Sequence, residues 1–354
     1  MSTRPRFAII GAGNGGLATA ADLTLRGHHV VAMYNRTFDR LRPVVERGGI
    51  EAVGLRSGFA RIDNVTDDIG KAVRDADVIL VVMPAFGQAW VAEKLVPYLR
   101  DGQIVLLAAG YLGTLEVQRI WRECGLKAKV FLAEAQGLFY GGRQAGPAKV
   151  HIINVRSRLP TAALPAGDTG HVLDVLKDAF PQLHPAADVL DVGITNINIP
   201  EHVPLCVLNF ARWQKEGATA HIPDWKTPPV VRLANLIDDE RRAVARAYGV
   251  SDATLDELRR GTYVGERQEM RQSSEEVPET AGVLPRRYIT EDVPMGFVPL
   301  YQLAQVAGVT TPVLRLMIDL SSVLLETDFM SEGRTLTKLG LAGMSVEQIK
   351  ARVR

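Results

Sequence analysis

Six residues near the start of the chain constrain its fold more than any other segment. Gly11-Ala12-Gly13-Asn14-Gly15-Gly16 directly follows the apolar run Phe7–Ile10, and the next residues, Asn14 to Arg26, carry apolar side chains at helical spacing. A glycine loop between a strand and a helix is the G-x-G-x-x-G arrangement of dinucleotide-binding folds, where backbone amides at the helix N-terminus meet a pyrophosphate. A glycine-rich turn without a ligand is the alternative. The predicted cofactor-binding residues of this loop are Gly11, Gly13, Asn14 and Gly16.

Apolar runs and amphipathic segments alternate along the chain up to about residue 190. We predict strands over Phe7–Ile10, His29–Tyr34, Asp77–Met83, Gln103–Ala108 and Lys129–Glu134. The segments with helical periodicity between them are Asn14–Arg26, Thr37–Glu46, Gln88–Leu99 and Leu115–Arg122. This βαβα order is typical of a doubly wound, mainly parallel sheet, so residues 1–190 are expected to form an α/β Rossmann-like domain that binds NAD(P). The segment Arg156–Gly170 is rich in Pro, Gly, Ser and Ala and is predicted to be a loop.

Long helical patterns replace this alternation after about Asp191. They cover Pro204–Lys215, Val230–Tyr248, Ala253–Arg260, Val298–Ala307 and Pro312–Thr327, with Gly249 as the expected end of the second. Residues 191–354 are therefore expected to form an all-α domain, interrupted by an exposed loop over Arg271–Pro285. The apolar side chains of the last predicted helix either belong to its core or join two copies in a homodimer.

The end of the second predicted strand bears on which dinucleotide is bound. Folds that bind NAD usually have an acidic residue about 20 residues beyond the glycine loop, where it accepts from the ribose 2′-hydroxyl. Here the neutral Asn35 occupies that place, and Arg36 and Thr37 follow. Because a guanidinium can hold a 2′-phosphate through two hydrogen bonds, we predict NADP (NADPH) as the preferred cofactor, with NAD possible. Pro84 follows the strand Asp77–Met83 at the ligand side of the sheet and is predicted to line the cofactor path, although a plain strand-to-helix turn is an equal alternative.

Composition excludes several classes of protein. Lys+Arg 41 against Asp+Glu 40 gives a net charge of +1, so a nucleic-acid partner is not expected. The longest apolar runs, such as Val78–Phe86, are far shorter than the roughly 20 residues of a membrane span. Cys124 and Cys206 are interpreted as reduced thiols of a cytoplasmic protein, and the spacing of the histidines and cysteines predicts no metal site.

A nicotinamide cofactor carries the hydride, so the protein must supply a proton donor and hold the substrate. The strongest candidate donor is His202, which follows Asn196 and Asn198 at the mouth of the predicted helix from Pro204. A histidine that only caps or packs is the alternative. In the second polar cluster, Arg286–Gly296, Asp292 is predicted to accept a hydrogen bond from His202 and fix its tautomer. The alternative there is that Thr290 or Asp292 caps the helix near Val298.

Three segments resemble the octopine/nopaline dehydrogenase family of opine dehydrogenases. Ala133–Arg143 is similar to that family's Ala-Glu-x-x-x-Leu-Pro-Tyr-x-x-Arg segment, with Phe139 in place of the usual proline. Asn196-x-Asn198-x-x-x-His202 resembles its Asn-x-Asn-x-x-x-His signature, and Arg287–Pro294 its Arg-Tyr-x-Thr-Glu-Asp-Val-Pro segment. The spacing of the three segments makes the resemblance specific.

The resemblance implies a reaction and a site. Such enzymes condense the amino group of an amino acid with a 2-oxo acid and reduce the resulting imine with NAD(P)H. It implies a catalytic dyad of His202 and Asp292, with the imidazole acting on the substrate carbonyl beside the nicotinamide. Small-molecule substrates with carboxylates need cationic or amide anchors, and structural ion pairs are the alternative for the two arginines. The predicted substrate-binding residues are Arg143, Asn198 and Arg287.

Two other functions remain open at this stage. A related two-domain reductase, such as ketopantoate reductase or glycerol-3-phosphate dehydrogenase, would reduce a carbonyl without an amine and would present a catalytic lysine, for which Lys215 and Lys226 are available. A non-catalytic protein that senses NADP is the second alternative. The polar clusters at 196–202 and 286–292 argue against it, because a sensor needs no proton donor.

Overall fold

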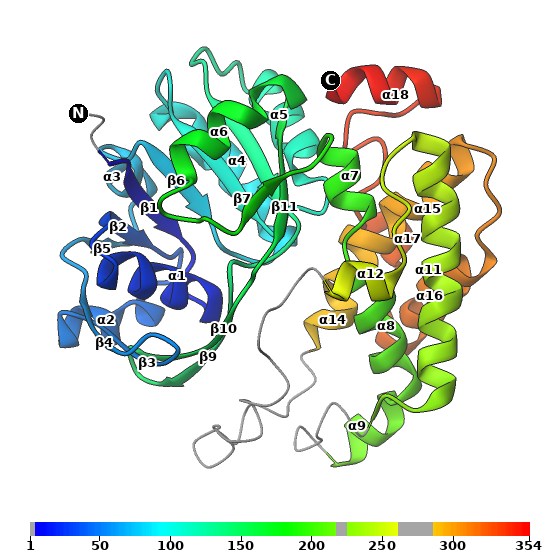
Figure 1. Cartoon of the computed structure of the whole chain (residues 1–354), viewed down its shortest axis with the longest axis horizontal. Helices are drawn as coiled ribbons and strands as arrows, with labels where there is room; N and C mark the ends of the chain where they lie inside the picture. Colours follow the sequence, from blue (N-terminus) through cyan, green and yellow to red (C-terminus); the bar gives the residue numbers. More distant parts are fainter. Residues whose placement is uncertain (1–3, 217–224, 261–285) are drawn as a thin grey trace. The chain divides into compact units, whose positions relative to one another are not determined.

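A computed structural model describes residues 4–216, 225–260 and 286–354. The chain divides into two compact units, one up to Val192 and the other holding most of the chain from Gly193 to Val353 (Figure 1). The change of pattern along the sequence places this boundary near residue 190. The first unit is α/β and the second is helical, and the fold class predicted from the sequence is therefore confirmed.

An eight-stranded sheet forms the centre of the first unit, in the order β12-β11-β8-β7-β6-β1-β2-β5. All its neighbouring strands are parallel except β11 and β8, which are antiparallel. Its strands are β1 (Arg6–Ile10), β2 (His29–Tyr34), β5 (Val65–Thr66), β6 (Val78–Val81), β7 (Ile104–Ala108), β8 (Phe131–Ala135), β11 (Leu159–Leu164) and β12 (Leu183–Pro185). The main helices around it are α1 (Asn14–Leu25), α3 (Ile69–Val73), α4 (Gln88–Leu95), α5 (Gly113–Glu123) and α6 (Thr169–Leu176).

The central strands are apolar throughout because both faces of the sheet are covered. In β6, Val78 and Leu80 enter one hydrophobic core, and Ile79 and Val81 enter the other. All four side chains are completely buried. A strand buried on both faces reads as a continuous apolar run, the pattern that predicts the segment Asp77–Met83 as a parallel strand.

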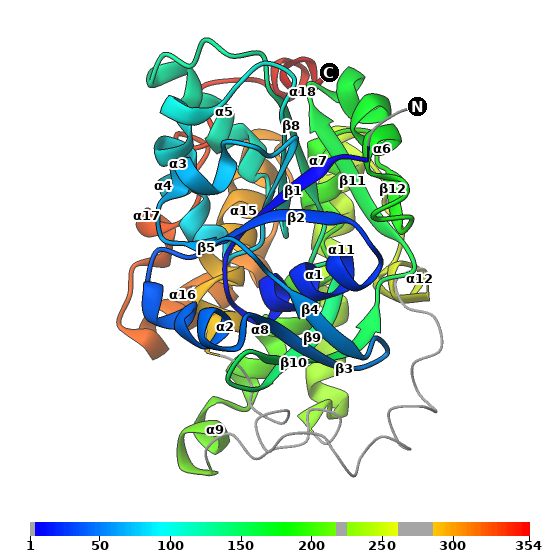
Figure 2. The same cartoon turned by 90° about the vertical axis from the view of Figure 1, so that its left-hand side faces the viewer.

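A second, four-stranded sheet in the same unit has no counterpart in the sequence-based prediction. Its order is β4-β3-β10-β9, with β3 (Gly49–Gly54), β4 (Gly58–Arg61), β9 (Tyr140–Gly146) and β10 (Lys149–Val155). It packs against α1 (Figure 2). The buried carboxylate of Asp22 on α1 joins the two, accepting from the Tyr140 hydroxyl at 2.7 Å and from Arg56 Nε at 2.9 Å. This contact depends on residues far apart in the sequence.

Two predicted local structures differ in the structure. The segment Arg156–Gly170 is not a loop, because β11 occupies Leu159–Leu164 between β8 and β12. Its small apolar side chains are buried there, so pairing with two neighbouring strands overrides the composition. The predicted helix Thr37–Glu46 is divided into a 3-10 turn, η1 (Phe38–Arg40), and α2 (Arg42–Arg47), with Pro43 in the first turn of α2.

The described residues of the second unit form helices and no strand. They are α8 (Asn198–Leu208), α9 (Phe210–Glu216), α11 (Pro228–Tyr248), α12 (Leu255–Arg260), α14 (Arg287–Thr290), a π-helical turn (Val293–Phe297), α15 (Val298–Val306), α16 (Pro312–Leu325), α17 (Phe329–Glu332) and α18 (Val346–Val353). A further helix, α7 (Val189–Ile194), spans the boundary between the units. No helix within the described ranges is long and apolar enough to cross a membrane. The predicted loop Arg271–Pro285 lies outside the described residues.

Helices α11 and α16 pack side by side (Figure 1). Gly249 ends α11 in the left-handed conformation, φ 69°, as predicted. Glu240 on α11 accepts hydrogen bonds of 2.8 Å from the amides of Val313 and Leu314 at the start of α16. In α16 the apolar side chains face in two directions: Leu314, Met317 and Ile318 are buried, whereas Leu316 and Leu320 are exposed.

Candidate active site

The glycine loop lies where β1 ends and α1 begins, and each glycine has a different surrounding. A Cβ at Gly11 would overlap the carbonyl oxygen of Val82, and one at Gly16 would overlap that of Gly11. A Cβ at Gly13, the N-cap of α1, would meet no atom of the described chain within 4 Å. Gly11 and Gly16 therefore allow close backbone packing, whereas Gly13 leaves open space beside the N-terminus of α1.

Asn35 and Arg36 follow β2 beside this loop. The Asn35 side chain accepts from the Ala12 amide at 3.3 Å and donates to the Thr37 carbonyl at 3.0 Å, so it ties the glycine loop to the end of β2. Arg36 is exposed, and its guanidinium carbon lies 5.4 Å from the centre of the Trp90 ring on α4. A cation over an indole face is attracted by the ring quadrupole, which limits the directions that the Arg36 side chain takes.

The other predicted cofactor residues have different surroundings. Thr37 is exposed at the N-cap of η1, and Pro84 is half-buried at the start of the turn η2 (Ala85–Gly87), beyond the carboxyl end of β6. Asn14 differs, because its side-chain oxygen accepts from the Gln144 amide of β9 at 2.8 Å. That oxygen is therefore occupied in holding the four-stranded sheet against α1.

His202 and Asp292 are brought together in the second unit from two separate segments. His202 Nδ1 lies 2.7 Å from Asp292 Oδ2, and the side chains are 20% and 3% exposed. Asp292 occupies the N-cap position of the π-helical turn, but its carboxylate contacts the imidazole instead. The alternative in which Thr290 or Asp292 caps the helix near Val298 is wrong, because the N-cap of α15 is Phe297.

The sequence pattern predicts that His202 lies just before its helix, but the structure places His202 inside that helix. Helix α8 begins at Asn198, and Pro204 lies inside it. A proline inside a helix removes one backbone hydrogen bond, but Val203 and Pro204 are buried in the core of the unit, which stabilises the helical path. One turn beyond His202, burial raises the pKa of the Cys206 thiol, as does the nearby negative charge of Asp292. Cys206 is therefore an inert buried thiol.

Tyr288 on α14 covers one face of the imidazole. The ring centres of His202 and Tyr288 are 3.6 Å apart and their planes differ by 5°. The Arg287 guanidinium carbon lies 5.8 Å from the centre of the Tyr288 ring, and Arg287 forms an ion pair of 3.2 Å with the buried Glu291. Sequence reasoning assigned no role to Tyr288, because the stack joins residues from two distant segments that only folding brings together.

The three predicted substrate anchors are divided between the units. Arg143 lies on β9 in the four-stranded sheet, half-buried, and donates to the Gly142 carbonyl at 3.1 Å. Arg287 and Asn198 belong to the second unit. The Asn198 amide donates to Asn196 Oδ1 at 3.0 Å, and the buried Asn196 Nδ2 has no hydrogen-bond partner among the described residues.

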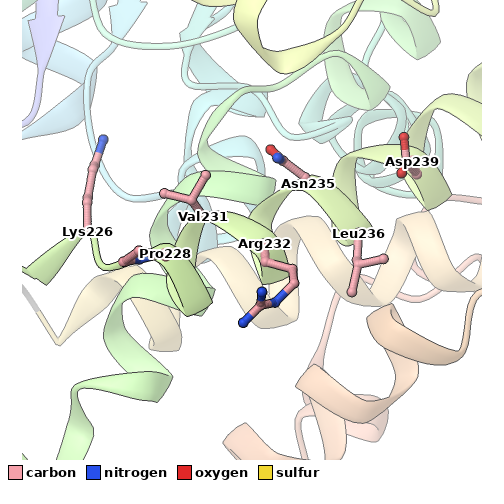
Figure 3. A pocket seen from close by; sticks show the side chains of 7 residues that line it. All are labelled: Lys226, Pro228, Val231, Arg232, Asn235, Leu236 and Asp239. Carbon is pink, nitrogen blue, oxygen red and sulfur yellow. The ribbon is translucent and has the colours of Figure 1, made fainter.

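The two lysines available for the catalytic lysine of a carbonyl reductase lie in other surroundings. Lys226 lines an open groove of about 530 Å³ along α11, together with Pro228, Val231, Arg232, Asn235, Leu236 and Asp239 (Figure 3). His202 and Asp292 are not among its lining residues within the described chain. Lys215 is exposed near the end of α9.

Comparison with known proteins identifies the family. Residues 185–325 match the alpha-helical domain of NAD/NADP octopine/nopaline dehydrogenases, a range that includes both members of the histidine–aspartate pair. Residues 6–110 match an NADP oxidoreductase domain, described as coenzyme F420-dependent.

The matched relatives are similar over nearly their whole length. An opine dehydrogenase of Arthrobacter sp. (strain 1C) is 35% identical over 98% of this chain and 98% of its own. A vitopine synthase of Allorhizobium ampelinum is 26% identical over 97% and 98%. A solved octopine dehydrogenase, in complex with NADH and agmatine, has the same fold, with a TM-score of 0.70 over 98% of this chain and 97% of its own at 17% identity. This chain therefore belongs to the octopine/nopaline dehydrogenase family of NAD(P)-dependent oxidoreductases.

Proposed function

We propose that this enzyme condenses the amino group of an amino acid with a 2-oxo acid and reduces the imine to a secondary-amine dicarboxylate, with His202 as its acid–base group. The observation that carries the proposal is the 2.7 Å contact between His202 and the buried Asp292, inside the helical unit that matches the family. The opine dehydrogenase named above, 35% identical over 98% of this chain, supports the same reaction class.

The residues of the glycine loop fit a dinucleotide. Gly13 leaves open space at the N-terminus of α1, and the backbone amides there attract a pyrophosphate. When bound, the nicotinamide cofactor supplies the hydride that reduces the imine carbon. The side chains of the protein must then transfer the proton, orient the substrates and assist the loss of water.

Asp292 determines what the imidazole can do. An ionised carboxylate only accepts hydrogen bonds, so Nδ1 of His202 carries a hydrogen and Nε2 is the nitrogen that exchanges a proton with the substrate. His202 in its protonated form polarises the 2-oxo acid carbonyl as the amine attacks. One amine proton passes to the oxygen as the carbinolamine forms. His202 then gives its proton to that hydroxyl, which leaves as water, and takes up the second amine proton as the imine forms, so that the imidazole is protonated again.

The substrates carry carboxylates, and we infer that arginine and amide side chains bind them. Arg143 and Arg287 can each form two parallel hydrogen bonds with a carboxylate, and Asn198 can add a single hydrogen bond. The 3.2 Å ion pair with Glu291 holds the Arg287 side chain in one orientation. We expect Arg287→Lys to raise KM for the 2-oxo acid more than KM for the cofactor, because a lysine lacks the planar pair of donors.

The test of the reaction is the oxidation of NADPH with a panel of 2-oxo acids, each with and without a panel of amino acids. Oxidation that requires the amine supports the proposal. Oxidation by a 2-oxo acid alone would instead indicate a carbonyl reductase, and tight NADPH binding without turnover across the whole panel would indicate a sensor.

The test of the dyad compares His202→Gln with His184→Gln. His184 is a matched control because it lies on β12 of the first unit, where its Nδ1 contacts the Gln182 carbonyl at 2.8 Å. We expect His202→Gln to lower kcat by about 10²–10⁴ and to leave the Kd for NADPH nearly unchanged. Full activity of His202→Gln at pH 7 would refute the assignment.

We also propose that Arg36 favours NADPH over NADH. Its guanidinium is exposed and held over Trp90, and a 2′-phosphate would gain charge-assisted hydrogen bonds there. We expect Arg36→Ala to lower kcat/KM for NADPH by about tenfold or more, with little change for NADH, since a charge-assisted hydrogen bond contributes about 1.5–3 kcal/mol. Arg40→Ala removes the same charge from the exposed turn η1 and is the control. An NADH preference in the wild type that Arg36→Ala leaves unchanged would contradict the proposal.

A further inference from the structure

The imidazole of His202 is held by two groups. Asp292 contacts the edge of the ring at Nδ1, and Tyr288 covers one face, with ring centres 3.6 Å apart and planes within 5°. A hydrogen bond at one edge fixes which nitrogen faces the carboxylate, but it leaves the ring plane free to rotate about that contact. A parallel ring in van der Waals contact removes this freedom. Tyr288 therefore determines the direction in which Nε2 points.

The stack leaves the imidazole little freedom to move. Carbon atoms in contact lie about 3.5–4.0 Å apart, so ring centres at 3.6 Å in parallel planes leave almost no sideways offset. The tyrosine ring therefore covers nearly the whole of one imidazole face, and a tilt of the imidazole toward it would bring atoms of the two rings into overlap.

The Tyr288 ring is itself held on α14. The Arg287 guanidinium carbon lies 5.8 Å from the centre of the Tyr288 ring, and Arg287 forms an ion pair of 3.2 Å with the buried Glu291. Asp292, which contacts the edge of the imidazole, follows four residues after Tyr288. One short segment therefore supplies both groups that hold His202.

We propose that Tyr288 is a positioning residue of the proposed reaction: its ring fixes the plane of the His202 imidazole and thereby the direction in which Nε2 points. This inference rests on the proposed function, because it assigns to Tyr288 a role that acts through His202. Tyr288→Leu removes the aromatic face at similar bulk, whereas Tyr288→Phe keeps the face and removes only the hydroxyl. Tyr301→Leu is the matched control, since that tyrosine lies on α15 with Arg315 at 5.8 Å from its ring centre, the same distance as Arg287 from Tyr288.

The first measurement is steady-state kinetics in the direction of opine formation, with kcat, the KM for the 2-oxo acid and the Kd for NADPH determined separately. We expect Tyr288→Leu to lower kcat by about tenfold through loss of orientation and to leave the Kd for NADPH nearly unchanged. Tyr288→Phe should restore the rate, and Tyr301→Leu should leave all three constants unchanged. Wild-type kinetics in Tyr288→Leu, or equal damage in the Phe and Leu variants, would overturn the proposal.

The second measurement needs no turnover. In protein labelled with carbon-13 histidine, the signal of His202 is identified as the one missing from His202→Gln. A parallel ring at 3.6 Å shifts the ring protons of His202 strongly upfield, so we expect this shift in the wild type and in Tyr288→Phe and its loss in Tyr288→Leu. A signal that does not respond to Tyr288→Leu would refute the stack. An intact response in a protein that makes no opine would instead refute the proposed function and leave the contact between the two rings established.

Discussion

Glu134 gives the sharpest test of how the first unit is built. It is completely buried on β8, and its carboxylate accepts from the Leu112 amide at 3.0 Å, from the Thr114 amide at 2.9 Å and from the Thr114 hydroxyl at 2.7 Å. These amides lie at the start of α5, so a side chain from a neighbouring strand caps this helix. The loop before α5 holds Ala109, Tyr111 and Leu112 at φ values of 60°, 53° and 63°. Such left-handed residues cost about 1–2 kcal/mol each, and the carboxylate offsets this strain.

The substitution Glu134→Gln removes the charge while keeping the shape. The glutamine has one amide oxygen, so it can accept from Thr114 or from Leu112, but its NH₂ group then faces a buried donor on the other side. Two charge-assisted hydrogen bonds become neutral at a loss of about 1 kcal/mol each, and one orphaned buried donor costs about 1–3 kcal/mol. We therefore expect a loss of about 3–5 kcal/mol in the free energy of unfolding, which lowers Tm by about 6–20 °C for a unit of this size.

The assay is urea and thermal unfolding followed by circular dichroism. Glu123→Gln is the control on the same helix, because it removes a carboxylate that is 54% exposed and paired with Arg119 at i,i+4 spacing. Such pairs contribute about 0.3–0.5 kcal/mol. If Glu134→Gln were no more destabilising than Glu123→Gln, the capping role of Glu134 would be refuted.

Three further predictions concern other parts of the molecule. The Gly16→Ala variant should unfold or fail to accumulate, because its Cβ would overlap the carbonyl oxygen of Gly11. The Gly13→Ala variant should keep the wild-type Tm and bind NADPH more weakly in a fluorescence titration. Burial lowers the pKa of His28, so as pH falls the unfolded chain takes up a proton at about pH 6.5, before the folded chain does. The free energy of unfolding should therefore decrease as pH drops below this value. Replacement of His28 by Phe should flatten the change of Tm between about pH 5 and 7, and an unaltered slope would contradict this. Burial raises the pKa of the Cys206 thiol, so iodoacetamide at pH 8 should modify the exposed Cys124 and leave Cys206 intact, as peptide mass mapping would check.

The sequence predicts well the parts of this protein that depend on local pattern. The glycine spacing at 11, 13 and 16, the apolar run of β6 and the glycine that ends α11 each follow from the needs of a few neighbouring residues. Family segments that surround His202 and Asp292 also allow the pair to be named before the fold is known, because each segment is readable by itself. The structure contains the hydrogen bond between the two side chains, while the catalytic role of the pair is a proposal.

The tertiary structure alone decides what joins distant segments. β11 forms inside a segment whose composition suggests a loop, because β8 and β12 supply hydrogen bonds and cover its small side chains. Helix α8 continues through Pro204, since burial of its apolar residues outweighs the lost hydrogen bond. The position of Tyr288 over His202 and of Glu134 at the start of α5 depends on side chains from separate elements meeting in three dimensions. Spacing along a chain does not encode such contacts, because they arise from the packing of the whole unit.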